Sequence, residues 1–377
     1  MFLGVGAAAA GSGATWLNRR LGPGLVDWNL VRSIAMRMAG EEPEPAAFFD
    51  GPQDIAAMVE RCRNAASQYL EMPIPRDPAP AATLDRAAWI DVNVANFRRL
   101  LEPVEEAYRG TNVMDAPVGR MVSGVAKLTV SLQLGAMLGF LSRRVLGQFD
   151  IPLLEPGEGR IYLLDTNIFR LSASMRVDAG HLRQWVALHE TTHAIAFEST
   201  PWLRDYLAGM LRDYLKEAGR TIMTPGALRT RVARLKTSAR SDGLRLGGLL
   251  RLMLSEDQAR IVSRVQALMS VMEGYSNHAM HATGVALIPN YRYLAARLKG
   301  REKSRGLGFQ IVTRLLGLEL KFEQYVIGEA FVDRVVRERG MRTMNTVWDS
   351  PEALPTLEEV RAPERWIRRI ELIDGRT

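Results

Sequence analysis

Helical periodicity is the feature of this 377-residue sequence that most restricts its fold. Apolar residues recur at spacings of three and four along six long stretches, a pattern typical of amphipathic helices. The stretches are Val26 to Met38, Asp50 to Tyr69, Val92 to Tyr108, Ser123 to Leu146, His181 to Glu198 and Glu256 to His281. Only one segment, Arg160 to Asp165, is typical of a strand. The sequence therefore predicts a mainly α fold with a very small β-sheet.

Proline residues predict where several of these helices end. The segment Pro73 to Pro80 holds too many prolines for a helix and is expected to be a surface connector. A second break is expected from Asp150 to Gly159, directly before the predicted strand. Pro103 is expected to kink or break the third helix, because proline removes a helical hydrogen bond.

The C-terminal third continues the helical pattern with interruptions. A helical pattern from Leu307 to Arg339 is expected to be broken near Gly317 and Gly328. Three prolines between Trp348 and Ile373 predict loops and short helices there. The composition, 47% hydrophobic and 24% charged, is that of an ordinary globular protein.

The charge balance gives no sign of a nucleic-acid partner. Lys and Arg number 49 against 42 Asp and Glu, a mild formal excess of +7 for this length. The densest basic stretch, Arg229 to Arg251, lacks the interleaved aromatic residues of a base-stacking surface. It is interpreted as a solvated helix face or loop. Residues Arg229 to Gly248 could form a lid over a site or a mobile basic loop.

Membrane and disulfide signals are weak. The apolar stretch Leu128 to Leu141 has 14 residues and contains Gln133, so it falls short of the ~20 residues of a spanning helix and is predicted to be a buried core helix. Arg19 and Arg20 follow the apolar N-terminal run, the wrong order for a secretory signal, although an interfacial role of the first ten residues stays open. A lone Cys62 excludes an intrachain disulfide. A cytoplasmic protein without a transmembrane segment is predicted.

The sequence WVALHETTHAIAFE carries the strongest chemical signal. His189 and His193 lie four residues apart, so on a helix both imidazoles can approach one ion from the same side. Neutral imidazole nitrogens suit Zn²⁺, and Glu190 is placed to act as general base on a metal-bound water. The apolar flanks predict burial, whose cost for these polar groups a metal would offset. The alternative is a pair of core histidines with ordinary hydrogen bonds.

A catalytic zinc needs a third protein ligand. Glu273, an isolated acid in the apolar run ALMSVMEGYSNHAMHATG, is a candidate, since a buried carboxylate needs a partner. It could instead pair with an arginine or cap a turn. His181, His278 and His281 are further ligand candidates. His278 or His281 could also support a ligand or donate to an oxyanion, and either could be a surface histidine.

Longer segments around these residues resemble a known family. VALHETTHAIAF, TPWLRDYL and MSVMEGYSNHAM together resemble zincin-like hydrolases described as zinc-dependent metalloproteases, one branch of which carries a label of association with deazaflavin coenzyme biosynthesis. The resemblance also covers DWNLVRSIAMRMAG and LGFLSRRVLGQFDIPLL upstream, and ELKFEQYVIGEAFVDRVV and WDSPEALPTLEEVRAPERWIRR downstream. It therefore spans nearly the whole chain from Asp27 onward.

The resemblance implies a mainly helical, gluzincin-like zincin fold in which an HExxH helix and a later glutamate helix hold one zinc ion per chain. Carried over by position, His189, His193 and Glu273 are the ligands and Glu190 is the base. We expect one large domain over residues 1–377, with a helical part at 1–150 and the zinc-site part at 151–377. The chain departs from the family at Asn277 and His281, where acidic residues are common.

The sequence thus predicts a zinc-dependent hydrolase in which metal-activated water attacks a peptide or small amide carbonyl. The strand at Arg160 to Asp165 could be an edge strand that pairs with an extended peptide, or it could only close the small sheet. Tyr275 or Tyr325 could stabilise the oxyanion. The alternative is a zinc-binding scaffold without turnover; the intact Glu190 argues against it. A role in deazaflavin coenzyme synthesis has no support here, because the sequence has no phosphate-binding GxxxxGK loop.

Overall fold

The computed structural model describes residues 24–41, 54–75, 77–109, 117–153, 157–223, 255–300 and 323–375. These residues form a mainly helical fold with one small three-stranded sheet, so the predicted fold class is confirmed. The chain divides into two compact units, the first from residues 1–42 and 84–145, the second from residues 43–83 and 146–377. A single large domain stays a prediction. The basic stretch Arg229 to Arg251 and the first ten residues lie outside the described ranges.

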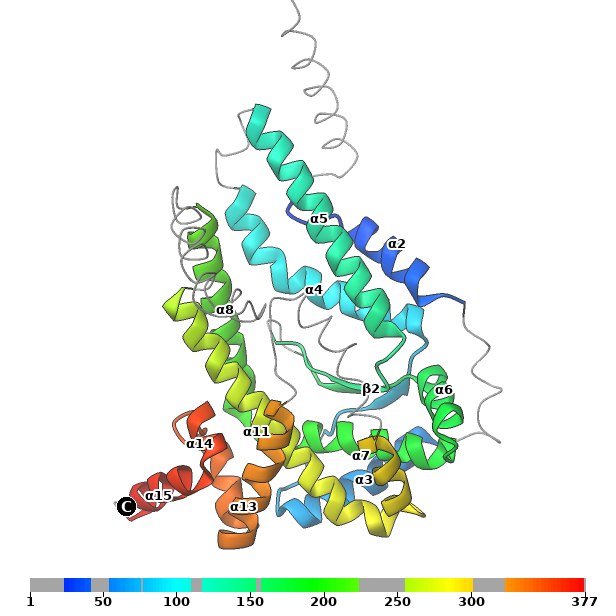
Figure 1. Ribbon diagram of the computed structural model, residues 1–377, viewed down its shortest axis with the longest axis vertical. Coiled ribbons are helices and arrows are strands. Elements are labelled where there is room, and N and C mark those ends of the chain that lie inside the picture. Colours follow the sequence, from blue (N-terminus) through cyan, green and yellow to red (C-terminus); the bar gives the residue numbers. More distant parts are fainter. Residues whose placement is uncertain are drawn as a thin grey trace, which may run out of the picture. The chain divides into compact units, whose positions relative to one another are not determined.

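The described part of the first unit is helical. It contains α2 (Trp28–Ala39), α4 (Arg86–Arg109) and α5 (Pro117–Ser142), drawn in blue to cyan-green in Figure 1. Asp27 caps α2 by accepting a hydrogen bond from the Leu30 N–H. All three helices pack against one another.

Two predictions for these helices need correction. Pro103 lies inside α4, which continues to Arg109, so of the predicted kink or break the break is wrong and the kink stays a prediction. The apolar stretch Leu128 to Leu141 is buried on one face only: Leu138 is buried, whereas Val130 and Leu132 are exposed, because α5 packs on its neighbours through a single side. Among the described residues, no helix has the length and apolar character to cross a membrane.

The second unit contains the sheet. Strands β1 (Ala81–Thr83), β2 (Gly147–Asp150) and β3 (Arg160–Leu163) have the order β1-β3-β2. β3 pairs in parallel with β1 and antiparallel with β2. The predicted strand is therefore central, and the interpretation of it as an edge strand is wrong. The edge strand that contacts the HExxH helix is β2.

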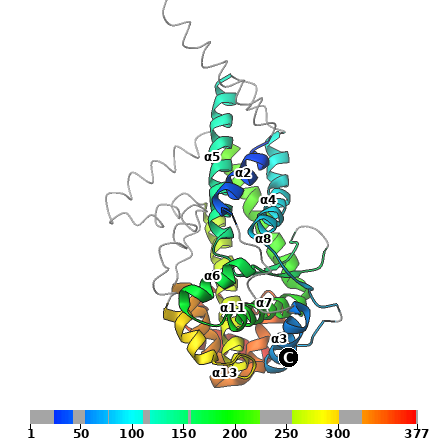
Figure 2. The same ribbon diagram turned by 90° about the vertical axis from the view of Figure 1, so that its right-hand side faces the viewer.

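The second unit also contains most of the described helices. They are α3 (Ile55–Leu70), α6 (Asp165–Met175), α7 (Ala179–Glu198), α8 (Pro201–Met223), α11 (Glu256–Leu287), α13 (Glu323–Asn345), η3 (Thr346–Trp348), α14 (Leu357–Arg361) and α15 (Pro363–Asp374). Residues 291–300 are also helical. Four of these helices (α3, α6, α8 and α11) pack against the motif helix α7, which also packs against β2 and β3. Figures 1 and 2 show α3, α7, α11 and α13 gathered at one end of this unit.

The structure corrects the boundaries predicted around α6 and α13. Asp165 begins α6 instead of ending the strand, and its carboxylate forms a buried bidentate ion pair with Arg183 on α7. α13 runs through Gly328 without a break, and its non-helical residue is Gly340. Gly328 serves close helix packing, since a Cβ there would lie 1.9 Å from the Ser270 carbonyl oxygen on α11. The loops and short helices predicted at the C-terminus are confirmed.

Candidate metal centre

The histidine pair lies on α7, which packs against the helices α3, α6, α8 and α11 and the strands β2 and β3. Asp178 caps α7, and Leu182, Val186 and Ile195 are buried along it, so its orientation is fixed by packing. With a spacing of four residues, His189 and His193 share one face, and their Nε2 atoms are 3.1 Å apart. The two histidines of the HExxH motif therefore lie next to each other, as predicted.

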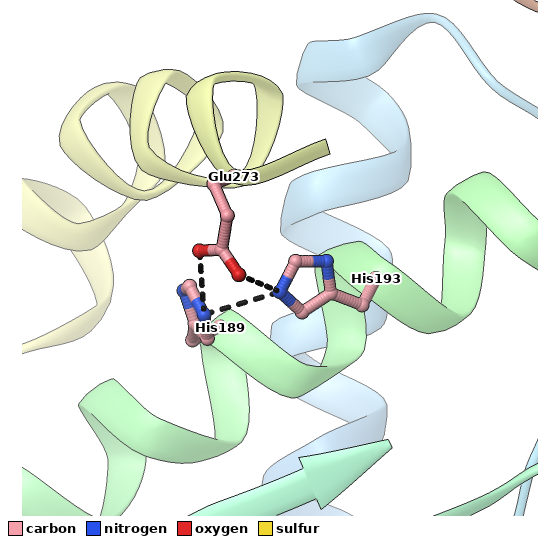
Figure 3. A group of neighbouring side chains, drawn as sticks. All are labelled: His189, His193 and Glu273. Carbon is pink, nitrogen blue, oxygen red and sulfur yellow. Dashed lines mark hydrogen bonds and ion pairs between the residues drawn. The ribbon is translucent and has the colours of Figure 1, made fainter. Parts of the chain in front are cut away.

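The third predicted metal-binding residue lies on α11, a separate helix that begins in a capping box formed by Ser255 and Gln258. Glu273 on this helix points toward the histidine pair, as Figure 3 shows. One carboxylate oxygen of Glu273 lies 3.6 Å from His189 Nε2, and the other lies 3.7 Å from His193 Nε2. The structure thus brings together the three residues predicted to hold a metal.

The spacing of these atoms fits a zinc ion. A tetrahedral zinc with bonds of about 2.0–2.2 Å has ligand atoms about 3.3–3.6 Å apart. The two Nε2 atoms are 3.1 Å apart, each lies 3.6 or 3.7 Å from a different oxygen of Glu273, and one ligand atom from each side chain lies within 4.8 Å of the other two. The side chains of His189, His193 and Glu273 keep 18%, 13% and 17% of their surface exposed, so the group is not sealed from solvent. Within the described ranges, this is the only group of three such side chains close enough to share an ion.

The electrostatic environment keeps both histidines neutral. Burial lowers the pKa of His189 to about 4. Burial, together with the neighbouring His189, also holds the pKa of His193 well below its ordinary value. Neutral imidazoles have a free lone pair, so both side chains are ready to bind a metal at neutral pH without losing a proton first.

Glu190 lies beside this group on the side of β2. The Phe149 N–H on β2 donates a hydrogen bond of 2.8 Å to Glu190 Oε2. Burial raises the pKa of Glu190 to about 8, the Phe149 N–H opposes this rise, and the charge of Glu273 adds to it. Gly147 permits the contact between β2 and α7, because a Cβ there would lie 2.6 Å from Val186 Cγ1 and 2.9 Å from Glu190 Oε1.

The other predicted residues contact different partners. His278 bonds through Nδ1 to Asp333 (2.6 Å) and through Nε2 to the Tyr69 hydroxyl (2.7 Å), which links α11 to α13 and α3. His281 contacts the Tyr291 hydroxyl through Nδ1 at 2.9 Å. None of these nitrogens belongs to the group of metal-binding atoms in the described part of the chain.

The tyrosine and the remaining histidine candidate also lie apart from the group. The buried Tyr275 donates its hydroxyl hydrogen bond to Asn345 Oδ1 at 2.7 Å. His181 lies near the start of α7, with Nδ1 3.8 Å from Asp178. The side chain of Tyr325 and the possible lid at Arg229 to Gly248 lie outside the described residues.

Residues that the sequence analysis missed surround the histidines. Ser276 Oγ and Met280 Sδ on α11 contact the outer nitrogens of His193 and His189. Trp185 stacks on His189 with parallel rings whose centroids are 5.9 Å apart. The signal that could have found two of them is helical spacing, since Ser276 and Met280 follow Glu273 by three and seven residues.

Comparison with known proteins agrees with this geometry. The sequence profile of a family described as zincin-like metallopeptidases matches residues 26–367. The chain belongs to this family. A zincin-like metallopeptidase implies a bound metal, usually zinc. No curated protein sequence matches the chain.

One solved structure resembles this zincin-like chain over most of its length. It is the crystal structure of a protein from Chloroflexus aurantiacus described as a candidate hydrolase with a novel fold. The two chains are 30% identical with a TM-score of 0.66, and the match covers 92% of this chain and 99% of the other.

Proposed function

We propose that this chain is a zinc-dependent hydrolase that acts on peptide or small amide bonds, with His189, His193 and Glu273 as ligands and Glu190 as general base. The observation that carries the proposal is the convergence of two imidazole Nε2 atoms and one carboxylate, with a second carboxyl group beside them. A structural metal site would not need that second carboxyl.

Each residue of the centre has a separate role in the proposed hydrolysis. Zn²⁺ held by this group would lower the pKa of a water molecule to ~7 and polarise the substrate carbonyl. Glu190 would accept the proton of the attacking water and deliver it to the leaving nitrogen. The Phe149 N–H, bonded to Oε2, orients this carboxyl group. The neutral histidines keep their lone pairs for the metal.

The backbone of the edge strand β2 favours an extended peptide as the substrate. Leu164 N–H donates to the Leu146 carbonyl, so Leu146, Gln148 and Asp150 face β3 and the residues between them face outward. The outward residues are Gly147 and Phe149, next to Glu190. An extended peptide that paired with the Gly147 backbone and the Phe149 carbonyl would bring its amide bonds to the base.

Metal content is the first test. Elemental mass spectrometry should find about one zinc per wild-type chain and much less in Glu273→Ala. Glu338→Ala, which removes an exposed glutamate from α13, is the matched control and should keep the zinc. If wild type, reconstituted with zinc, holds none, the metal centre is wrong.

Hydrolysis of a peptide library is the second test. Glu190→Gln should keep the zinc and lose about 10²-fold or more of the rate, because general acid–base catalysis contributes roughly 10²–10⁴-fold. Equal rates for Glu190→Gln and wild type would exclude Glu190 as the base. Zinc binding without hydrolysis of any library member would favour the non-catalytic zinc-binding scaffold.

A further inference from the structure

Each histidine of the metal centre has a second nitrogen that points away from the group. His189 Nδ1 lies 3.1 Å from Met280 Sδ, and His193 Nδ1 lies 3.1 Å from Ser276 Oγ. Met280 and Ser276 are each 1% exposed, so the protein leaves little room for water to replace them as partners. Both histidines are thus contacted on their outer side by buried side chains of α11.

These two side chains lie on the same face of α11 as Glu273. Ser276 and Met280 follow Glu273 by three and seven residues, which at 100° per residue keeps all three within about 60° of one another. One helix therefore supplies the carboxylate and the partners of both imidazoles. A shift of α11 along α7 would disturb all three contacts together.

Both contacts are compatible with the same tautomer. Met280 Sδ can only accept a hydrogen bond, which favours a proton on His189 Nδ1, and the Ser276 hydroxyl supports the same tautomer of His193 when it accepts from Nδ1. That proton leaves the Nε2 lone pair free, and the two Nε2 atoms are those that face Glu273. A thioether is a weaker acceptor than a hydroxyl oxygen. His189 therefore receives weaker support than His193.

We propose that Ser276 and Met280 are positioning residues of the metal centre, which fix the Nε2-binding tautomers of His193 and His189, and that Met280 makes His189 the weaker of the two histidine ligands. This inference rests on the metal site of the proposed function but not on hydrolysis. Partners of metal-binding histidines typically affect metal affinity by 10–100-fold.

The test measures metal binding by competition with a chromophoric chelator and by the visible absorption spectrum of the Co²⁺-loaded protein. Ser276→Ala and Met280→Leu should weaken zinc affinity about 10-fold or more and shift the Co²⁺ bands. Met280→Gln offers an amide oxygen as acceptor and should bind zinc at least as tightly as wild type. It is the rescue variant: leucine and glutamine both replace the methionine, but only glutamine can accept a hydrogen bond from His189 Nδ1.

Matched controls come from the same helix. Ser270→Ala removes a buried hydroxyl that bonds to the Gln266 carbonyl, and Met272→Leu replaces a buried core methionine. Both should leave zinc affinity and the Co²⁺ spectrum unchanged. Wild-type affinity in Ser276→Ala and Met280→Leu, or equal losses in the controls, overturns the proposal. A wild type that binds neither metal overturns it together with the metal centre, whereas zinc binding without hydrolysis leaves it intact.

Discussion

The carboxyl group of Glu190 is surrounded by groups that favour its neutral form. Burial raises its pKa to about 8 from an ordinary value of 4.5, against the opposing hydrogen bond from Phe149. In the unfolded chain the same carboxyl is exposed to water and ionises near its ordinary pKa. The metal-free folded protein therefore holds a proton on Glu190 that the unfolded chain releases between about pH 4.5 and pH 8.

This difference predicts how the stability of the metal-free protein depends on pH. A raised folded-state pKa contributes stability that is present below pH 4.5 and lost as the pH rises through 8. Relative to Glu190→Gln, the wild type should lose up to about 1.4 kcal/mol per pH unit over this range. Urea denaturation in the presence of a chelator, repeated at several pH values, measures the difference in the free energy of unfolding between the two proteins. The contribution of histidine titration cancels in this difference, because both proteins contain the same histidines. A flat difference would mean that Glu190 is already ionised in the metal-free fold.

Only part of this centre could be predicted from residue types. The spacing of His189 and His193 alone places them side by side, since helical geometry is nearly invariant. Helical spacing places Ser276 and Met280 on the same face of α11 as Glu273, but whether that face meets the histidines depends on how the two helices cross, which the sequence does not give. The hydrogen bond from Phe149 had no sequence signal at all, because a backbone N–H donates whatever side chain it carries.

The position of Glu273 depends on how closely α11 approaches α13. A Cβ at Gly328 would lie 1.9 Å from the Ser270 carbonyl oxygen, and a Cβ at Gly274 would lie 2.3 Å from the Gly328 backbone. The two helix backbones therefore touch directly at Gly274, the neighbour of Glu273. Rigid backbone atoms cannot move aside as a flexible side chain can.

Gly328→Ala should accordingly destabilise the zinc-loaded protein by about 3 kcal/mol, the upper part of the range for an overpacked core. The zinc content per chain should fall as well, because α11 carries Glu273. Urea denaturation and elemental mass spectrometry measure the two effects. Gly209→Ala on α8 is the matched control: a Cβ there meets nothing within 4 Å, and the substitution should be neutral or stabilising by up to ~1 kcal/mol. Equal effects at both glycines would contradict direct backbone contact.

The contact between β2 and α7 depends on Gly147 in the same way. Gly147→Ala would place a Cβ 2.6 Å from Val186 Cγ1 and 2.8 Å from Glu190 Cγ, so it should separate Glu190, the proposed base, from the edge strand. We expect zinc binding to persist, because the metal-binding side chains do not touch Gly147, while the rate of peptide hydrolysis falls. Adding Val186→Ala removes the closest contact and should restore part of the rate. An unchanged rate in Gly147→Ala would mean that the approach of β2 does not orient Glu190.

At the scale of elements, the long helices were predicted well and the sheet was predicted poorly. Periodic burial along α3, α7 and α11 spans several turns, which gives a sequence pattern enough length to be recognised. β1 has three residues and β2 has four, too few for an alternation to stand out. Gly328 was misread as a helix break because the same residue type also permits close helix packing.

At the scale of the whole molecule, the two compact units do not follow the order of the chain. The second unit takes residues 43–83 from the N-terminal part, and the first unit takes the following residues 84–145. The reason is long-range strand pairing: β1, at residues 81–83, forms its ladder with β3 about 80 residues later. All members of the metal centre belong to the second unit, and so do α3 and β2, which pack against α7.

Zinc should therefore stabilise the two units unequally. At 100-fold excess over the dissociation constant, a ligand that binds only the folded state adds about 2.7 kcal/mol to the unit that binds it. Hydrogen exchange with and without zinc should show slower exchange in α3, α7 and α11, and unchanged exchange in α2, α4 and α5. Glu273→Ala is the control and should show no zinc effect in either unit. If zinc slowed exchange equally in both units, they would unfold together, as expected of one large domain; slowing confined to the second unit would identify it as a separate cooperative unit.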